Sequence, residues 1–500
     1  MSILQASHLP LALQTRYVGK YPWWRSLALF LLLLLSIVLY GVLITAAPQS
    51  DTEITPFLHA WLLCFLPYFA ACALILATRP VTNRWRWVEL GIIFVGALLF
   101  RAMLLPLPPG LSHDSWRYLW DARVTLHGYS PYVYPPNDKI FSSLWDQVIY
   151  ANSRYRNSPT IYPPGAQAVY LLSYILAPSN LYFLKGIFIV FDMLTCGVLA
   201  LLLVRKGLDP RRILIYAWCP LPIVEYAVQG HVDVITITFT ALSILSATST
   251  RRGSRVLTGF FIGMATLTKI YPILLLVAIM RRRDWALLAT CVATIILAYI
   301  PYLILGHGQV LGYISSYSGE QGGNAGVVQL AIYSISQNRG FKLAGTVMLQ
   351  HIVDVLVVCG MSLVVLLLRL FKGISIEAGT MLLIGTFLAI SAHVFPWYIP
   401  ALLPWIAILI GPLWTRRGPS PQGLAVGIAW YFVCVSLTGY FFSNTLDWHI
   451  YYEFVYDVVM AGLGIALVLG IWKELKLFYR RPWKENQGNA PQHRRDTFVG

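Results

Sequence analysis

Apolar runs long enough to cross a bilayer recur along the whole chain, and short polar stretches separate them. A membrane helix needs about 20 mostly apolar residues, so the pattern predicts an all-α polytopic membrane protein. We expect about 12–14 transmembrane helices in one membrane-embedded domain over residues 1–500. The candidate spans, some of them short, are 27–47, 57–77, 88–107, 181–204, 213–228, 232–249, 256–268, 270–280, 285–305, 346–368, 376–395, 397–413, 424–443 and 453–472.

Basic residues cluster in the short stretches between these spans. Cytoplasmic loops carry an excess of Lys and Arg, so we expect the clusters to face the cytoplasm. An even number of crossings then places both termini in the cytoplasm, including a tail over 473–500. The chain is predicted to be a multi-pass protein of the cell (plasma or inner) membrane. The clusters include Arg79/Arg84/Arg86, Arg205/Lys206/Arg211/Arg212, Arg251/Arg252/Arg255, Arg281 to Arg283 and Arg416/Arg417.

Composition agrees with a membrane protein. The 500 residues are 57% apolar and only 12% charged, whereas soluble domains carry about 25% charged residues. The net charge of +16 is explained by membrane topology, so no nucleic-acid partner is expected. The seven cysteines all lie in apolar runs without a CxxC spacing, which favours small core residues over a disulfide framework or a metal site.

The longest polar segment, 106–165, is predicted to lie outside the cytoplasm as a folded cap. It contains the stretch HDSWRYLWDAR, His113 to Arg123, and is rich in Trp and Tyr. Disordered segments are poor in aromatic residues, whereas Trp and Tyr are common at membrane surfaces. If 113–127 is helical, Asp114 and Asp121 share one face. The alternative is an ordinary surface helix with an Asp114–Arg117 pair.

Further polar motifs interrupt the apolar runs on the same predicted side. Two hairpins, 256–280 and 376–413, are expected to be broken at their tips, because non-helical backbone at membrane depth must be surrounded by protein or water. Segment 166–177 is too short to span and is expected to be interfacial or re-entrant. The motifs are Tyr162-Pro163-Pro164, Gly230-His231-Val232-Asp233, Thr268-Lys269-Ile270-Tyr271-Pro272, His393-Val394-Phe395-Pro396-Trp397-Tyr398 and Asp447-Trp448-His449.

These residue types suit transfer of a sugar from a lipid phosphate. The phosphate is a good leaving group, so the reaction needs one base for the acceptor hydroxyl and cations for the departing anion. Asp114 is the candidate base, since partial desolvation raises the basicity of a carboxylate. Lys269 is the candidate cation, because an ammonium at a hairpin tip is costly without an anionic partner. The aromatic residues suit stacking on sugar faces.

Several charged residues have a plainer interpretation as well. Asp121 could orient Arg117, contact the acceptor or only pair with Arg123. Asp233 could simply cap a helix. His393 could bind phosphate or lie at the lipid headgroups. Arg101 is expected to extend toward the membrane surface, and Lys185 is a second candidate for the donor phosphate. Asp192 and Glu225 are expected to have structural partners.

Residues 112–124, with Gly128, Pro131 and Tyr132 after them, resemble the first outer loop of GT-C class membrane glycosyltransferases. The nearest pattern is that of the polyprenol-phosphate-mannose-dependent mannosyltransferases of glycosyltransferase family 87. Its D-x-x-R-Y-x-W-D-G motif reads Asp114, Arg117, Tyr118, Trp120 and Asp121 here, with Ala122 for the usual Gly and Ser130 for a usual Asn. The Y-P-P, G-H-x-D, T-K-x-Y-P and P-W-Y motifs follow in order.

The resemblance implies a GT-C-like fold whose large first outer loop is catalytic. It implies Asp114 as the base, a β-linked lipid-phosphate sugar as donor and an inverted, α-linked product. Asp114 and Asp121 are the candidate catalytic residues, and no cofactor or divalent metal is expected, because the sequence shows no obvious ligand cluster. The implied substrate-binding residues are Arg117, Tyr118, Trp120, Tyr162, His231, Asp233, Lys269, Tyr271, His393, Trp397 and Tyr398.

The sequence therefore predicts a hexosyltransferase. It would move a hexose, with mannose as the first candidate, from a polyprenyl phosphate to a lipid-linked or glycan acceptor on the non-cytoplasmic face. A transporter or lipid-glycan flippase is the alternative, although transporters usually carry internal repeats and none is visible here. A ligase or polymerase of preassembled glycans is a third option.

Overall fold

A computed structural model describes residues 23–48, 54–78, 83–317, 319–320, 324–340, 343–416, 418–444 and 451–479. Within these ranges the protein is helical, apart from a two-residue hairpin of β1 (Trp414–Thr415) and β2 (Gly418–Pro419). The predicted all-α fold class is confirmed. The motif at Asp447 to His449 and most of the predicted tail, 480–500, lie outside the described residues.

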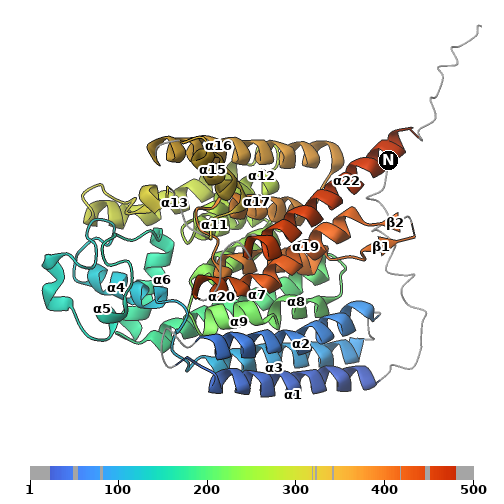
Figure 1. The fold of residues 1–500 in the computed structure, drawn as a ribbon, viewed down its shortest axis with the longest axis horizontal. Helices are drawn as coiled ribbons and strands as arrows, with labels where there is room; N and C mark the ends of the chain where they lie inside the picture. Colours follow the sequence, from blue (N-terminus) through green and yellow to red (C-terminus); the bar gives the residue numbers. More distant parts are fainter. Residues whose placement is uncertain are drawn as a thin grey trace, which may run out of the picture.

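Three long helices near the start of the chain form one side of the molecule (Figure 1): α1 (Trp24–Thr45), α2 (Thr55–Ala77) and α3 (Asn83–Leu104). Each helix buries one face and exposes another that is equally apolar. On α1, for example, Leu29 and Leu33 are buried while Leu31 and Val38 are exposed. An extensive exposed apolar surface of this kind is stable when lipid covers it.

Between α3 and α7 (Leu181–Arg205) the chain forms a group of short helices, and this group includes the segment 106–165 that was predicted to be a cap. Its elements are α4 (Asp114–Leu126), η3 (Lys139–Leu144), α5 (Ile149–Asn152) and α6 (Pro164–Leu176), and α4 packs against α6. Trp120 forms the centre of the cap, with ring contacts to Phe141 and Tyr150. The predicted helix at 113–127 is confirmed as α4, and the segment predicted to be interfacial or re-entrant is α6.

The centre of the molecule consists of short helices that are completely buried. The predicted span 213–228 is wrong as a continuous helix, because it is divided into α8 (Leu214–Ala217) and α9 (Pro220–Ala227). Pro220 begins the second helix, a position where its missing N–H costs nothing. The neighbouring elements are η4 (Pro210–Ile213) and α10 (Asp233–Ala247).

Both predicted hairpins are broken at their tips, as expected. The first comprises α11 (Ser254–Thr266), η5 (Tyr271–Leu275) and α12 (Leu276–Ile279), and the second contains α17 (Ile376–Ile390), η7 (Pro396–Leu402) and α18 (Leu403–Leu409). Each 3₁₀ segment has a proline at its first or second residue, Pro272 or Pro396, and proline does not fit the interior of a continuous α-helix. The remaining elements are α13 (Trp285–Leu305), α14 (Ile314–Tyr317), α15 (Val327–Asn338), α16 (Leu343–Leu367), η6 (Leu368–Lys372), α19 (Pro421–Val435), η8 (Ser436–Thr438), α20 (Gly439–Asn444), η9 (Tyr452–Asp457) and α22 (Val458–Tyr479).

Eight helical segments in the described ranges are long and apolar enough to cross a membrane. The chain is therefore a multi-pass membrane protein. Five of the segments are the single helices α1, α2, α3, α7 and α13. The other three are α16 continued by η6, α19 continued by η8 and part of α20, and η9 continued by α22. The other predicted spans coincide with the shorter or broken helices around the buried centre.

Arg101 of α3 does not extend to the membrane surface, so that prediction is wrong. Its guanidinium is fully buried, and Nε lies 2.6 Å from Oδ2 of Asp192 on α7. The other oxygen of Asp192 accepts a hydrogen bond of 2.6 Å from Tyr216. The expectation that Asp192 has a structural partner is confirmed.

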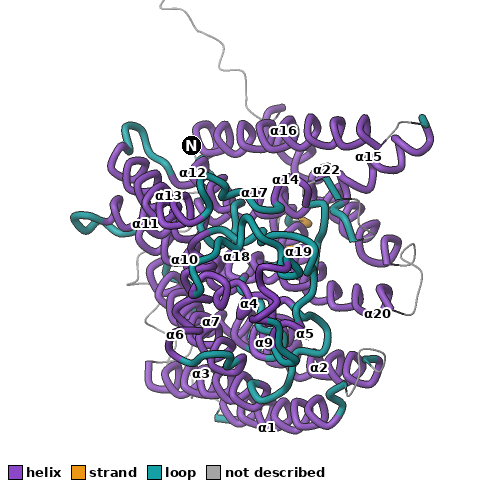
Figure 2. Tube along the Cα trace, turned by 90° about the vertical axis from the view of Figure 1, so that its left-hand side faces the viewer, coloured by secondary structure: helices purple, strands orange, loops and turns teal. Residues whose placement is uncertain are grey.

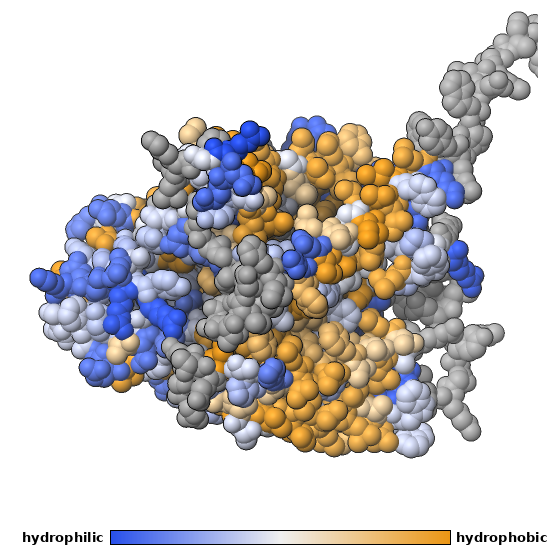
Figure 3. Space-filling view, viewed as in Figure 1, coloured by the Kyte–Doolittle hydropathy of each residue, from blue (hydrophilic) through white to orange (hydrophobic). Residues whose placement is uncertain are grey.

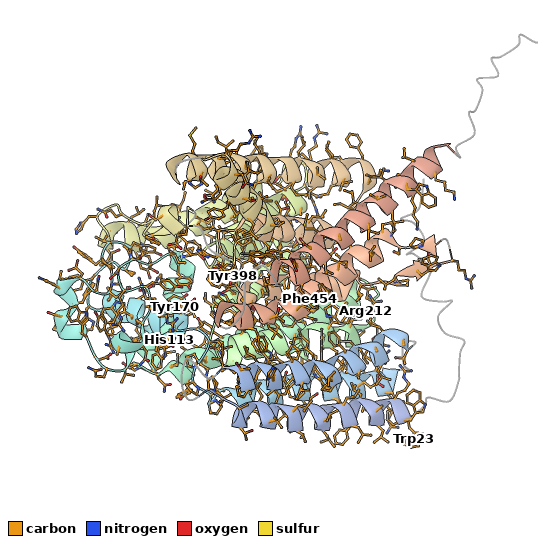
Figure 4. All side chains as sticks on the ribbon, viewed as in Figure 1. Trp23, His113, Tyr170, Arg212, Tyr398 and Phe454 are labelled. Atoms are coloured by element: carbon orange, nitrogen blue, oxygen red, sulfur yellow. The ribbon has the colours of Figure 1, made fainter. Side chains whose placement is uncertain are left out.

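The two ends of the molecule differ in polarity. Figure 3 shows a hydrophilic cap at one end, a broad apolar belt and hydrophilic residues at the opposite end. His113 and Tyr170 lie at the cap end, whereas Trp23 and Arg212 lie at the other (Figure 4). Viewed from the cap end, loops gather over the centre with helices around them (Figure 2).

Candidate active site

Asp114 is the first residue of α4 and lies at the inner side of the cap. The hydroxyl of Tyr162 donates a hydrogen bond of 3.3 Å to Oδ2 of this carboxylate. The same oxygen lies 4.0 Å from Nδ1 of His231, and 18% of the Asp114 side chain remains exposed. The carboxylate is thus reachable, yet enclosed by residues from two other motifs.

Lys269 projects from the break between α11 and η5. Its Nζ atom lies 3.2 Å from Oδ1 of Asp233, the first residue of α10. The ammonium also lies 4.3 Å from the ring centre of Tyr398 and 5.5 Å from that of Tyr162, distances typical of cation–π contacts. The Lys269, Asp233 and Tyr398 motifs, far apart in sequence, therefore meet at the same place as Asp114.

Burial and charge act in opposite directions on the Asp114 carboxyl group. Burial raises the pKa of Asp114 above its usual range, and the ammonium of Lys269, the hydroxyl of Tyr162 and the guanidinium of Arg117 partly offset this rise. The net result is a carboxylate that is more basic than an ordinary aspartate. A general base benefits from such a change, since its pKa moves closer to neutral pH.

His231 is completely buried between the two carboxylates of Asp114 and Glu225. Its Nε2 atom lies 3.3 Å from Oε2 of Glu225, which also accepts a hydrogen bond from Tyr440. The imidazole stacks on Trp397, with ring centres 3.9 Å apart and planes within 9°. These contacts fix the ring beside Asp114.

Gly230 allows the chain to bring His231 this close. Its φ of +71° falls in the left-handed region, which favours glycine. A Cβ atom here would also lie 3.0 Å from Cγ of Lys185 and 3.3 Å from Cβ of Ser115. Glycine is therefore required at this position by both backbone conformation and space.

A cavity of about 280 Å³ lies next to this group. Its walls come from the loop before α6, the Lys269 turn, α14, α16 and the end of α17. In Figure 4, Tyr398 marks the region between the cap and the helical body. The predicted site residues on the cavity wall are Tyr162, Asp233, Lys269, Tyr271, His393 and Tyr398.

Tyr271 and His393 lie on the cavity wall with contacts of their own. Tyr271 stacks on Phe387, with ring centres 4.5 Å apart. The ring nitrogens of His393 lie 2.8 Å from Oδ1 of Asn324 and 3.0 Å from Oε2 of Glu320. His393 is therefore positioned by the loop that precedes α15.

Arg117 and Asp121 are placed in the hydrogen-bond network of the cap. Arg117 donates to Asp121 over 2.8 Å and to the carbonyl oxygens of Tyr155 and Ser158 over 2.9 Å each. The other oxygen of Asp121 accepts a hydrogen bond of 3.0 Å from Gln167. Asp121 thus pairs with Arg117 and not with Arg123, which forms an ion pair with Asp146 over 2.6 Å. Arg117 also holds the 155–158 loop.

Tyr118 and Trp120 are buried in the cap. The hydroxyl of Tyr118 lies 3.2 Å from that of Tyr162. Tyr118 therefore helps to position Tyr162. Trp120 is 1% exposed, which leaves no ring face for a sugar in this conformation. Lys185 binds the backbone oxygens of Leu105 and Leu107 over 2.8 and 2.5 Å, so it acts as a structural link to the end of α3.

Sequence reasoning did not include four residues that the structure brings near the site: Tyr440, Tyr317, Gln329 and Asp354. Tyr317 binds the hydroxyl of Tyr398 over 3.0 Å, and Asp354 lines the cavity. A carboxylate within the long apolar stretch of α16 was the available signal for Asp354. Among the described residues, no group of three His, Cys, Asp or Glu side chains is placed to hold a metal ion.

The described residues form an all-helical membrane protein with eight candidate spans, and comparison with known families assigns it to the GT-C class of membrane glycosyltransferases. Residues 160–396 match glycosyltransferase family 87, and the chain thus carries a domain of that family. The resemblance seen in the sequence is confirmed over this range, which includes His231, Lys269 and His393 but begins after Asp114. No match was found among curated proteins.

Proposed function

We propose that this membrane glycosyltransferase transfers one hexose, with mannose as the first candidate, from a polyprenyl phosphate to a lipid-linked or glycan acceptor. The observation that carries the proposal is the arrangement around Tyr162. Its hydroxyl binds Asp114, while its ring faces the ammonium of Lys269. One tyrosine thus contacts both the candidate base and the candidate cation, the two kinds of group that this reaction requires.

In the proposed reaction, Asp114 accepts the proton of the acceptor hydroxyl. The acceptor oxygen then forms a bond to the anomeric carbon, and the bond from that carbon to the phosphate oxygen breaks. The leaving phosphate keeps the electron pair, and its added negative charge is held by Lys269. Because attack and departure take place on opposite sides of the carbon, the configuration is inverted.

The ion pair between Lys269 and Asp233 is compatible with phosphate binding. An ammonium group has three N–H donors, and Asp233 lies against one side of it at 3.2 Å. Asp233 would hold the ammonium in place at the cavity wall and leave other donors for a phosphate. This favours a positioning role for Asp233 over simple capping of α10.

A second, apolar cavity supports a lipid donor. It has a volume of about 620 Å³ and is lined by α17, α18, α19 and α22. The end of α17 contributes to both cavities, through Leu388 to the apolar one and Ile390 to the polar one. A prenyl chain in the apolar cavity would bring its phosphate toward Lys269.

The membrane orientation is also part of the proposal. Arg212 lies at the end opposite the cap (Figure 4), and the positive-inside rule assigns that end to the cytoplasm. The cap and the cavity then face the non-cytoplasmic side of the cell membrane. The first helix, α1, begins at the cytoplasmic side, and the last, α22, ends there.

The test is an assay of purified protein in liposomes with radiolabelled polyprenyl-phosphate-mannose and a set of lipid acceptors. We expect a product that gains one hexose, as measured by mass spectrometry, and released polyprenyl phosphate. Polyprenyl-phosphate-glucose in a parallel reaction tests the choice of sugar. Counterflow of the labelled lipid without any product would instead favour the flippase alternative, which the large apolar cavity would also suit.

A further inference from the structure

Asp354 is a carboxylate in the wall of the polar cavity that the reaction described above does not use. It lies eleven residues into α16, which begins at Leu343, or about 16 Å along the helix at 1.5 Å per residue. The surrounding sequence, Val353 to Val358, is otherwise apolar. An ionisable residue inside a membrane helix is costly and usually marks a functional pathway or site.

Gln329 of α15 fixes the direction of this carboxylate. Its Nε2 atom donates hydrogen bonds of 2.6 Å to Oδ1 of Asp354 and 3.0 Å to the carbonyl oxygen of Ile390. Both partners are acceptors, so they also determine which end of the amide is nitrogen. Gln329 is 2% exposed. The buried amide of Gln329 therefore fixes the orientation of the Asp354 carboxylate in the cavity wall.

The cavity therefore has two polar regions of opposite character. Lys269 supplies a cation on one part of the wall, and Asp354 supplies hydrogen-bond acceptors on another. The volume of about 280 Å³ equals about nine water molecules at ~30 Å³ each, which suits one sugar ring better than an oligosaccharide.

We infer that Asp354, held by Gln329, accepts hydrogen bonds from hydroxyl groups of the donor hexose and thereby determines which hexose is used. The inference rests on the proposed function and names the sugar-recognition subsite of the same cavity. A carboxylate can accept from two neighbouring hydroxyls at once, and a site built to bind a hydroxyl strongly rejects an analogue that lacks it. The phosphate would lie at Lys269 and the sugar would extend toward α16.

The test combines one substitution with a series of donors. Short-chain polyprenyl-phosphate-mannose is compared with analogues that lack the hydroxyl at C2, C3, C4 or C6, using wild type and Asp354→Asn. With wild type, we expect at least one analogue to lose 100-fold or more in kcat/KM. With Asp354→Asn, we expect a similar loss on the parent donor, and a much smaller further loss on that analogue, because the two changes remove the same interaction.

Two further variants keep the outcome clear. Asp354→Glu retains a carboxylate and is expected to recover part of the discrimination, which separates recognition from folding. Asp138→Asn changes a carboxylate of the cap that lies outside the cavity wall and is expected to behave as wild type. The inference is overturned if the Asp354→Asn variant loses the same factor on every donor, or loses nothing. If wild type transfers no hexose from any lipid phosphate, the proposed function itself fails.

Discussion

The hydroxyl of Tyr162 lies 3.3 Å from Oδ2 of Asp114, and the same tyrosine presents its ring to Lys269. One side chain thus contacts both the candidate base and the candidate cation. Tyr162 follows directly from the cap loop and precedes the Pro163-Pro164 start of α6, so it links the cap to the membrane body. The base and the cation, which come from different segments of the chain, therefore share one contact residue at the start of α6.

The pH dependence of activity should report the protonation state of Asp114. A base acts only when deprotonated, so activity should fall as the pH drops through the pKa of this group. Because burial raises the pKa of Asp114, we expect the acidic limb of kcat/KM to lie at higher pH than for an ordinary aspartate.

The Tyr162→Phe variant extends this test. The hydroxyl of Tyr162 lowers the pKa of Asp114, so its removal should move the acidic limb further upward. A pH profile of transfer for both proteins makes the comparison. An unchanged or downward-shifted limb in the variant would exclude Asp114 as the titrating group or Tyr162 as its partner.

Substitution of Lys269 should weaken donor binding. A hydrogen bond to a charged group contributes about 1.5–3 kcal/mol, which corresponds to roughly a 10- to 150-fold change. We expect Lys269→Gln to raise KM for the lipid-phosphate sugar by such a factor and to lower kcat as well. Lys372→Gln is the matched control, since Lys372 is 54% exposed and pairs with an exposed Glu474. Equal donor KM values for both variants would show that Lys269 does not bind the donor phosphate.

The buried pair of Arg101 and Asp192 should matter for stability and not directly for chemistry. Removal of one partner of such a pair costs about 3–5 kcal/mol, because the other charge stays buried. We expect Arg101→Leu to lower the melting temperature in detergent strongly, and Arg101→Leu/Asp192→Leu to restore part of the loss. A double variant that loses the sum of both single changes would show that the charges are not coupled.

Much of the fold follows from local sequence features. The predicted helix 113–127 agrees with α4 to within one residue at either end. Helix boundaries are a local property, since they depend on residues close to them in the sequence. The breaks near Pro272 and Pro396 are likewise local, since proline cannot continue a helix. The division of 213–228 was missed, because an apolar run by itself does not reveal whether the helix inside it is continuous.

The parts of the site that were missed depend on contacts between distant segments. Arg117 was assigned to substrate, but the chain returns at Tyr155 and Ser158 and provides its acceptors. Asp192 pairs with a residue 91 positions away. Asp354 meets the cavity only because α15 and α16 pack beside the Lys269 turn. Such pairings are decided by tertiary packing, which one sequence does not encode in any local pattern.

The raised pKa of Asp114 also predicts the thermal stability of the Asp114→Asn variant. A raised pKa means that the folded state favours the neutral carboxyl group, so ionised Asp114 lowers stability at pH values above that pKa. Asp114→Asn is neutral at every pH and should therefore melt at the same temperature as wild type or higher. A clear decrease in melting temperature would show that ionised Asp114 supports the fold.

Transfer of labelled hexose by purified Asp114→Asn tests the central claim most directly. The control is Asp138→Asn, which changes another cap carboxylate while keeping the side-chain oxygen that caps η3. A general base contributes about 10²–10⁴-fold. We predict that Asp114→Asn loses activity by that factor while Asp138→Asn remains active. Transfer by Asp114→Asn at the wild-type rate would contradict the account.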